Sequence, residues 1–288
     1  MILYAPPGGI LDVVIRSFAQ KMQPSLGQTI LVDYKPGGNG AIAAEAFVRA
    51  APDGQTLLFD AIYNHTVLPK IQKLRYDPIA DFQPITPVFS TSIVLAVPKQ
   101  VPAKTVAELV AYARSKPGGV FYGSQGNGST GHILGSLFQG KSNAPMTHVP
   151  YKGANPLQTD LIGGRLDYGF ISYSTAMSQL NDLRILAIAS PDRWSGIPDV
   201  PTMAESGFPG VDFDTSFAMF APRGTPASIV ERLRREFHAA AQDKDLVGQL
   251  SARGLFVKTG TPAEVTGMIA TETRKVDSVV HSLNLAPN

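Results

Sequence analysis

The sequence predicts an α/β protein of two lobes, and three observations indicate this. Strand-like segments alternate with segments of helical spacing through most of the chain, which is typical of parallel sheets with helical crossovers. Two apolar segments that each end in proline, residues 92–98 and 216–222, enclose a central block. The chain of 288 residues is 44% hydrophobic, long and apolar enough for one large domain or two smaller ones.

The N-terminal part begins with a strand, a tight turn and a helix. Residues 2–5 are expected to form a strand stub, and Pro-Pro-Gly-Gly at 6–9 a turn. Apolar residues at helical spacing predict a helix over 11–26. A strand over 30–34, a glycine-rich turn over 35–40, an alanine-rich helix over 41–50 and a strand over 56–60 are expected to follow. The same order of elements starts again at Ile93.

The two proline-ended segments are expected to cross between the lobes. Each is followed by a helix start signal, Thr105 before residues 106–109 and Thr225-Pro226 before a helix over 227–241. We therefore expect residues 1–98 and 217–288 to form lobe 1 together, residues 99–216 to form lobe 2, and a ligand cleft to lie between them.

The composition argues against several classes of protein. Only 17% of the residues are charged, the net charge is +2 and no Lys/Arg run is present, so nucleic acid is not an expected partner. The absence of cysteine excludes disulfides, thiolate catalysis and cysteine metal ligands. No apolar run approaches the roughly 18 to 20 residues of a membrane span, and the first residues do not form a signal peptide. We expect a cytosolic or already processed chain, with a segment upstream of Met1 removed.

Residues 120–138 are typical of a strand, a glycine-rich turn and a helix start. Glycines at 123, 126, 128 and 131 permit backbone conformations closed to other residues, so N–H groups can converge ahead of the helix. A helix start carries unpaired N–H donors and a partial positive charge, and Ser129 or Thr130 can cap it. The segment predicts a site for a small anion.

The same turn has the spacing of a dinucleotide fingerprint. Gly126, Gly128 and Gly131 satisfy G-x-G-x-x-G after a strand and before a helix. The fingerprint also requires an acidic residue after the next strand to hold a ribose, whereas the strand over 146–150 is followed by Tyr-Lys-Gly. A small anion is therefore favoured over a nucleotide, with a purely structural turn as the remaining alternative.

Other loops follow predicted strands, where α/β proteins place ligand contacts. In the first loop Gly8 and Gly9 can expose N–H groups, and Asp12 either complements the helix dipole, positions the loop or receives a ligand's donor. Asn64 and His65 follow the strand over 56–60. Residues 172–175 are rich in hydroxyl groups and either bind a ligand or cap the next helix. Phe217 is a candidate ligand wall.

Catalysis and metal binding are not predicted. The five histidines, at positions 65, 132, 148, 238 and 281, show no short-spaced pair that would indicate a metal site. No G-x-S-x-G nucleophile elbow is present, because the window centred on Ser129 reads Asn-Gly-Ser-Thr-Gly. We expect no catalytic residue, no metal, no cofactor and no enzyme activity.

Short motifs spread over nearly the whole chain resemble those of one family. They are Pro6-Pro7-Gly8-Gly9 with Asp12 and Arg16, Pro36-Gly37-Gly38, residues 51–58, Tyr76-Asp77-Pro78 with Asp81-Phe82, residues 122–132, residues 148–153, and residues 198–202 with Glu205 and Gly207. Together they resemble the Bug-type solute-binding proteins of tripartite tricarboxylate transporters. The resemblance implies a periplasmic binding protein of type II (Venus flytrap), a monomer that closes on a small organic carboxylate and delivers it to membrane permease subunits.

The resemblance also implies a set of ligand-binding residues. In that family the ligand carboxylate is held largely by backbone N–H groups and ordered waters from the first loop and the Ser/Gly loop, here Pro7 to Asp12 and Ser124 to Ser129. The remaining loops would contact the rest of the ligand. The expected set is Pro7, Gly8, Gly9, Asp12, Asn64, His65, Ser124, Gln125, Gly126, Asn127, Gly128, Ser129, His132, Ser172, Ser174, Ser216 and Phe217.

The chain departs from the family pattern in two places. It lacks the family's signal peptide, so a periplasmic location follows from the resemblance alone. It has Ile-Ser-Tyr-Ser at 171–174 where the family commonly has an acidic residue after Phe, and Tyr173 with Phe217 would suit an aromatic ligand. An aliphatic dicarboxylate and an aromatic acid are both expected ligands. A nucleotide-dependent enzyme using the Gly126–Gly131 turn and a carboxylate sensor not coupled to transport remain alternatives.

Overall fold

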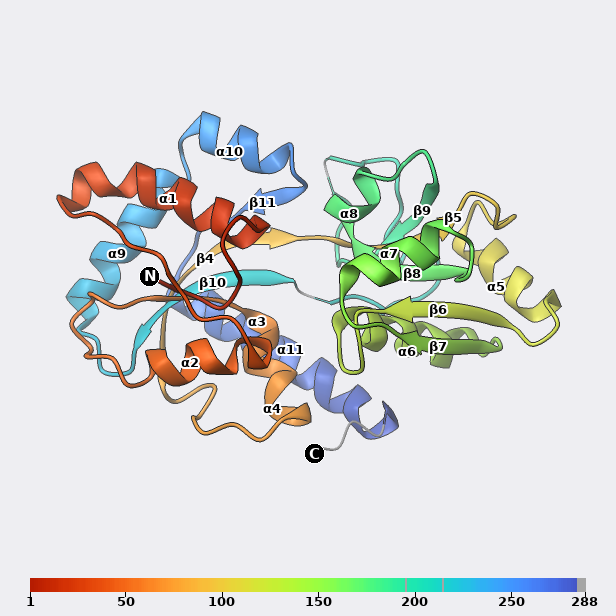
Figure 1. Cartoon of the computed structure of the whole chain (residues 1–288), viewed down its shortest axis with the longest axis horizontal. Coiled ribbons are helices and arrows are strands. Elements are labelled where there is room, and N and C mark those ends of the chain that lie inside the picture. The colour runs from red at the N-terminus through yellow and green to blue at the C-terminus, as the bar shows by residue number, and fades with distance from the viewer. Residues whose placement is uncertain (195, 214, 284–288) are drawn as a thin grey trace. The chain divides into compact units, whose positions relative to one another are not determined.

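The computed structural model describes residues 1–194, 196–213 and 215–283, and the chain divides into two compact α/β units (Figure 1). Of the described residues, the first unit contains 1–90 and 215–280, and the second contains 91–194, 196–213 and 281–283. The division differs from the expected lobes at both boundaries. Strand β5 (Ile93–Pro98) pairs with two strands of the second unit, and Ser216, at the start of β10 (Ser216–Pro222), pairs with Ser90 of the first.

The first unit is built on a mixed sheet of six strands. Its order is β11 (Leu255–Val257), β4 (Phe82–Thr91), β10, β3 (Leu58–Ala61), β1 (Ile2–Leu3) and β2 (Asp33–Tyr34). Strands β1, β2 and β3 are parallel, whereas β10 is antiparallel to both β3 and β4. The loops that follow the three parallel strands therefore leave the same edge of the sheet.

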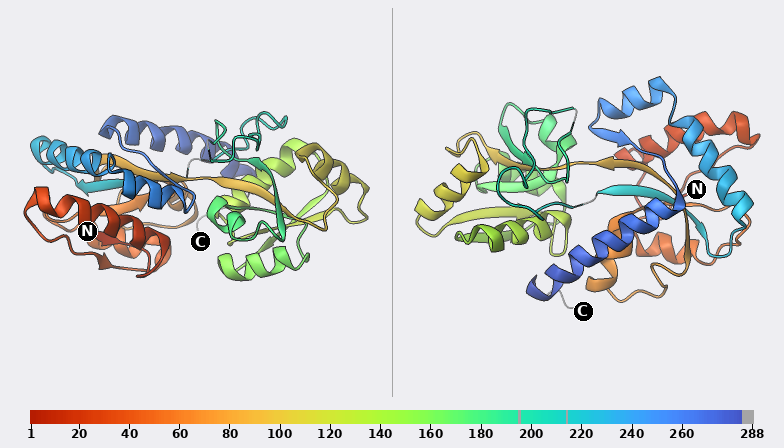
Figure 2. Two further views of the ribbon diagram at one scale, coloured as in Figure 1. Left: turned by 90° about the horizontal axis from the view of Figure 1, so that it is seen from above. Right: turned by 180° about the vertical axis from the view of Figure 1, so that it is seen from behind.

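Helices cover both faces of this sheet. They are α1 (Ile10–Leu26), η1 (Gly38–Gly40), α2 (Ala41–Phe47), α3 (Ile62–Thr66), α4 (Leu68–Ile71), α9 (Ala227–Ala240), α10 (Lys244–Ser251) and α11 (Pro262–Leu283). Side chains alternate along β3, so Phe59 packs in one core with α1 and α9 while Leu58 packs in another with α2 and α11. Figure 2 shows α11 on the opposite side of the sheet from α1.

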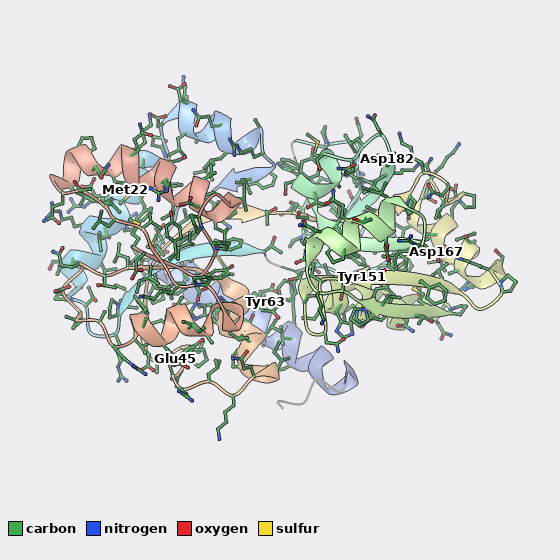
Figure 3. The ribbon with its side chains drawn as sticks, viewed as in Figure 1. Met22, Glu45, Tyr63, Tyr151, Asp167 and Asp182 are labelled. Carbon is green, nitrogen blue, oxygen red and sulfur yellow. The ribbon has the colours of Figure 1, made fainter. Side chains whose placement is uncertain are left out.

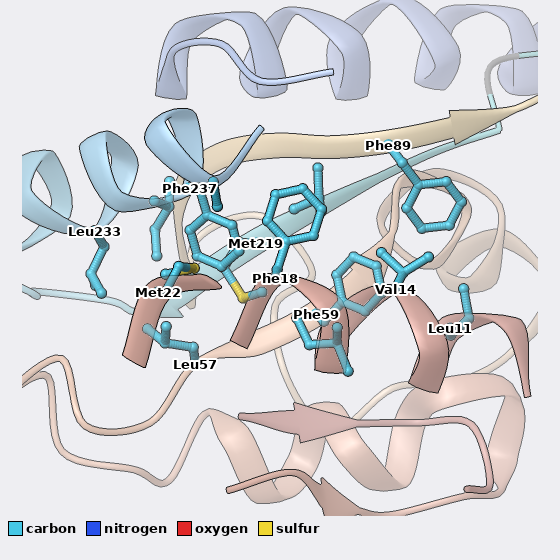
Figure 4. Packing of buried hydrophobic residues seen from close by; sticks show 14 of the residues in the cluster. Leu11, Val14, Phe18, Met22, Leu57, Phe59, Phe89, Met219, Leu233 and Phe237 are labelled. Carbon is cyan, nitrogen blue, oxygen red and sulfur yellow. The ribbon is translucent and has the colours of Figure 1, made fainter. Parts of the chain in front are cut away.

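The core beneath α1 shows why its sequence forms a buried helix. Val14, Phe18 and Met22 recur at helical spacing and are fully or almost fully buried (Figure 4). The ring of Phe18 lies 5.6 Å from that of Phe237 on α9. Gly27 ends the helix in the left-handed region, at φ 68°, where its N–H bonds to the Gln23 carbonyl. This packing fixes the N-terminus of α1 at the sheet edge.

The second unit has a five-stranded sheet of its own. Its order is β7 (Met146–Pro150), β6 (Val120–Ser124), β8 (Tyr168–Ser172), β5 and β9 (Leu183–Ile188). Strand β6 is parallel to β7 and β8, and β5 is antiparallel to β8 and β9. The helices of this unit are α5 (Val106–Ser115), α6 (Thr130–Ser142), α7 (Ala154–Ile162) and α8 (Tyr173–Met177).

A buried carboxylate ties α5 to this sheet. Asp167, labelled in Figure 3, accepts the Phe121 N–H at 2.8 Å and the Lys116 ammonium at 2.6 Å. Both oxygens are thus paired, as a buried charge requires. The contact joins α5 to the start of β8 and to β6, the strand that leads into the glycine-rich turn.

Candidate functional site

Asp12 holds the first glycine turn in place. Its Oδ2 accepts the Gly8 N–H at 2.8 Å, and its Oδ1 accepts the Tyr34 hydroxyl at 2.6 Å and Arg16 Nε at 2.8 Å. Burial on its own would raise the pKa of Asp12. The hydrogen bonds from Gly8 and Tyr34 and the charge of Arg16 lower it by more than burial raises it, so the pKa lies below its usual value. These contacts show that Asp12 positions the first glycine turn.

The start of α1 leaves backbone donors at the surface of this turn. The first helical bond is donated by Val13 to the Gly9 carbonyl, and Gly9, the N-cap residue, offers no side-chain cap. Within the described residues, the N–H groups of Ile10, Leu11 and Asp12 have no acceptor. Pro7 and Gly8 are exposed on the same turn. An anion placed here would meet several N–H groups and the positive end of a 17-residue helix.

The second glycine turn is held by its own hydroxyl groups. Ser124 Oγ donates to the Gly126 carbonyl at 2.9 Å, and Ser129 Oγ donates to the same oxygen at 2.7 Å. Ser129 is also the N-cap of α6 and accepts the His132 N–H at 3.4 Å. Both hydroxyl groups are therefore engaged within the turn. The exposed side chains of Gln125 and Asn127 are the polar groups that the turn presents outward.

The glycines of this turn serve two different purposes. Gly126 and Gly128 have φ of 127° and 77°, which other residues rarely adopt. Gly123 and Gly131 do not have positive φ, so the expectation of unusual backbone geometry was wrong for them. These two positions require glycine because there is no room for a side chain. A Cβ on Gly131 would lie 2.8 Å from the Phe170 carbonyl, and a Cβ on Gly123 would lie 2.3 Å from the Leu157 side chain.

The start of α6 resembles that of α1 in its free donors. The first bond into the helix is donated by Ile133 to the Ser129 carbonyl. In the described chain the N–H groups of Thr130 and Gly131 have no acceptor. The Gly128 N–H, by contrast, is donated to Nδ1 of His132 at 3.0 Å. The donors open to an anion are thus at the helix start and not at Gly128.

Two histidines stack beneath this turn. The imidazoles of His132 and His148 lie 4.0 Å apart with an interplanar angle of 12°. His148 Nε2 hydrogen-bonds with Ser124 Oγ at 2.7 Å. Burial lowers the pKa of His132, and burial together with His132 lowers the pKa of His148 to about 4. His132 lies at the turn as a buried support for it.

The structure gives His65 a place in the core of the first unit. Its ring lies 4.4 Å from Phe220 and 4.8 Å from Phe82, and Nδ1 bonds to the Pro78 carbonyl at 2.6 Å. Its side chain is 1% exposed, and Nε2 lies 3.4 Å from Asp60 Oδ2. Asn64 is buried as well and donates to Asp60 Oδ1 at 2.5 Å. These contacts hold His65 and Asn64 within the core of the first unit.

The hydroxyl-rich loop after β8 caps a short helix. Ser172 Oγ accepts the Thr175 N–H at 3.3 Å and hydrogen-bonds with the Ser174 hydroxyl at 3.2 Å. Tyr173 is buried, with its ring edge-on to Trp194 at 4.2 Å. The Tyr173 ring thus belongs to the core of the second unit, which argues against its use as a ligand wall.

The two candidates on β10 lie within the first sheet. Ser216 is buried, and Phe217 is partly buried. The Phe217 ring stacks on Phe89 with centroids 4.5 Å apart and an angle of 5° between the planes. Phe217 therefore continues the aromatic packing of Phe59 and Phe89.

Sequence reasoning missed two residues that support the turns. Tyr34 ends β2, which pairs with β1 so that Leu3 lies opposite Tyr34, and this places its hydroxyl beside Asp12. His148 lies opposite Tyr122 in the β6–β7 pairing. The parallel pairing of neighbouring strands could have indicated both, but their partners became evident only once the register was known.

The described residues contain no group of three or more His, Cys, Asp or Glu side chains able to hold a metal ion. Nor does any helix within these ranges have the length and apolar character to cross a bilayer.

A family model described as the tripartite tricarboxylate transporter family receptor matches residues 14–285. The chain belongs to this family. Protein BugT of Bordetella pertussis is 33% identical to it, over 97% of this chain and 87% of BugT. The resemblance to Bug-type proteins that the motifs indicated is thereby confirmed.

Solved structures of receptors of this kind share the fold. The periplasmic binding protein BugD aligns with a TM-score of 0.80 and 26% identity, over 100% of this chain and 98% of BugD. An R. palustris protein solved with adipate aligns with a TM-score of 0.84 and 29% identity over 100% and 97% of the two chains. MatC from Rhodopseudomonas palustris with bound malate aligns with a TM-score of 0.79 and 29% identity over 97% of each chain. The expected α/β binding-protein fold of two lobes is confirmed, and these relatives are solute-binding proteins rather than enzymes.

Proposed function

We propose that this receptor captures a small organic carboxylate in the periplasm and delivers it, as a monomer, to the permease subunits of a tripartite tricarboxylate transporter. The observation that carries the proposal is the pair of glycine turns, at residues 6–9 and 124–129, each followed by a helix whose first N–H groups lack acceptors. Adipate and malate, bound by two structural relatives, are ligands of this class.

In this proposal the helix start behind each glycine turn offers backbone donors to a carboxylate. The N–H groups at the starts of α1 and α6 hold a carboxylate directly or through water. The side chains of Gln125 and Asn127 and the hydroxyl groups of Ser172 and Ser174 contact the rest of the ligand. The backbone provides the positive potential, because Arg16 beside the first turn is already paired with Asp12.

An aliphatic dicarboxylate suits this arrangement better than an aromatic acid. The Tyr173 ring packs on Trp194 and the Phe217 ring on Phe89, so neither is free to stack on a ligand without moving. We infer no catalytic step, since the hydroxyl groups of Ser124 and Ser129 are engaged within the turn.

Ligand titration tests the proposed class. Thermal unfolding followed by isothermal titration calorimetry would compare adipate, malate, benzoate, NAD and NADP at neutral pH. We expect adipate or malate to raise the melting temperature and to bind with measurable affinity, and benzoate to bind more weakly. Stabilisation by NAD or NADP without stabilisation by any carboxylate would favour a nucleotide-dependent protein and overturn the proposal.

Coupling to transport needs a separate experiment. Deleting the gene should abolish uptake of the bound carboxylate by the native bacterium, and the wild-type chain expressed from a plasmid should restore it. Normal uptake by the deletion strain, with loss of a transcriptional response to the same carboxylate, would identify a sensor instead.

A further inference from the structure

Four aromatic rings stack beneath the second glycine turn, and two of them are histidines. His132 on α6 stacks on His148 on β7 at 4.0 Å, His148 on Tyr122 at 5.0 Å, and Tyr122 on Tyr168 at 5.2 Å. Each ring comes from a different element, so the stack joins α6 to three neighbouring strands. The rings at its end nearest the turn are the imidazoles, which hydrogen-bond to it.

The hydrogen bond to Gly128 requires a neutral His132. The Gly128 N–H donates to Nδ1 of His132 at 3.0 Å, and a nitrogen that accepts a hydrogen bond carries no proton. His148 Nε2 bonds to Ser124 Oγ at 2.7 Å, and the same oxygen contacts the carbonyl and N–H of Gly126. The two imidazoles thus fix Gly126 and Gly128, the residues of positive φ in the turn.

The surroundings of the pair disfavour a proton on either ring. The groups facing the pair are Tyr122 and Ser124 from β6, Tyr168 further along the stack from β8, and each imidazole facing the other. No carboxylate oxygen of a described residue lies within 4.0 Å of their ring nitrogens. Burial, without a compensating negative charge, keeps the pKa of both rings below its usual value.

We propose that His132 and His148 are positioning residues that make the ligand-binding turn sensitive to protons. With both rings neutral, the turn keeps the shape in which the start of α6 receives a carboxylate. A proton on His132 Nδ1 turns the acceptor of the Gly128 N–H into a second donor, which breaks that bond and opens the turn. A proton on His148 places a cation against the face of His132 and strains the same contacts. This inference rests on the proposed role of the turn in binding a carboxylate.

Two substitutions retain the hydrogen bonds but remove the titration. His132→Asn places an amide oxygen near the position of Nδ1, and His148→Gln places an amide nitrogen near that of Nε2. The double variant and the wild type would be titrated with adipate and malate by calorimetry from pH 7.5 to pH 4.5. Each pH unit below the pKa of a group that must be neutral lowers affinity up to about tenfold. The ligand's own protonation affects both proteins equally, so the difference between them reports the histidines.

We expect the wild type to lose more affinity than the double variant over this range, with the excess growing towards pH 4.5 as the imidazoles begin to take up protons. His238→Asn, at an exposed position on α9, is the matched control and should follow the wild type. Equal losses in the wild type and the double variant would overturn the inference. If the double variant does not fold, an NMR titration of the wild type, described next, tests the inference instead.

A measurement without ligand separates this inference from the proposed function. In the wild type, NMR should show the Gly128 amide shifting with the same midpoint as the ring nitrogens of His132. A Gly128 amide that stays unchanged while His132 titrates would overturn the inference, whatever the ligand. Failure of adipate, malate and benzoate to bind at any pH, with the coupled titration present, would contradict the proposed ligand class alone.

Discussion

The carboxylate of Asp12 accepts the N–H of Gly8, 2.8 Å away and four residues earlier in the chain. Gly8 has φ 82°, so the bond holds a residue that would otherwise sample many conformations. Tyr34 and Arg16 hold the other oxygen of the same carboxylate. The first turn is therefore fixed from β2 and α1 before any ligand arrives, as a preorganised binding loop requires.

Replacing Asp12 should weaken ligand binding although Asp12 need not touch the ligand. Asp12→Ala leaves the Gly8 N–H and the Tyr34 hydroxyl without their acceptor, at a cost of about 1–3 kcal/mol in the free energy of unfolding. We expect adipate or malate affinity to fall by at least about tenfold, since the turn loses its anchor. Calorimetry and urea unfolding would measure the two effects. Asp33→Ala, which removes an exposed partner of Lys35, is the control, and an unchanged affinity in Asp12→Ala would contradict the role of the turn.

Local patterns predicted the strand–turn–helix units well, because each depends on residues close in sequence. The helix over 11–26, the turn at 6–9 and the start of α6 are where their spacing and capping residues indicated. Strand β4 was not predicted, because Pro84 and Pro87 lie inside it and proline is unfavourable in a central strand. The β4–β10 register shifts between Phe217 and Ala218 and again between Met219 and Phe220, next to the positions opposite Pro87 and Pro84.

The site was predicted less completely, because hydrogen-bond partners distant in sequence decide what a polar side chain does. The glycine turns follow from composition alone, whereas the engagement of Ser124 by His148 depends on β6 and β7 being neighbours. His65 follows a strand, where ligand contacts are common, yet Phe82 and Phe220 enclose it. Burial of this kind is a tertiary property that one-dimensional spacing does not report.

Two glycines of α6 should respond in opposite ways to the same substitution. A Cβ on Gly135 would lie 2.1 Å from the Tyr122 ring, so Gly135→Ala forces the helix away from β6. Gly140 has nothing within 4 Å of the corresponding position, and alanine there restricts only the unfolded chain. We expect Gly135→Ala to lower the free energy of unfolding by about 1–3 kcal/mol and Gly140→Ala to raise it by about 0.4–1 kcal/mol. Equal shifts in urea unfolding would contradict this packing.

The stability of the protein should fall as the pH drops from about 6.5 towards about 4. An unfolded histidine takes up a proton near pH 6.5, whereas burial and the neighbouring His132 hold the pKa of folded His148 at about 4. The unfolded state thus binds more protons within this window, so stability rises with pH there and is constant above it. Carboxylates such as Asp12 and Asp243, whose pKa values are lowered, add their effect only at lower pH.

Urea unfolding at pH 7.5, 6.5, 5.5 and 4.5 would measure this dependence. His148→Gln removes one of the two buried imidazoles, His148, and leaves His132. The loss of stability between pH 6.5 and 4.5 should therefore become smaller than in the wild type. His238→Gln, which alters an exposed histidine, should leave the loss as it is. If the free energy of unfolding of the wild type stays constant between pH 6.5 and 4.5, the claim that His132 and His148 are neutral in the folded protein is wrong.

His65 should prove essential for stability and dispensable for ligand contact. His65→Ala removes a ring packed between Phe82 and Phe220 and leaves the Pro78 carbonyl without its donor, which should lower the free energy of unfolding by about 2–5 kcal/mol. At a temperature where the variant is still folded, its affinity for adipate or malate should stay within about threefold of the wild type, because its side chain is 1% exposed. His238→Ala, on the surface of the same unit, should change neither quantity. A large loss of affinity with little loss of stability would instead make His65 a ligand contact, since a buried packing residue cannot weaken binding without first loosening the core around it.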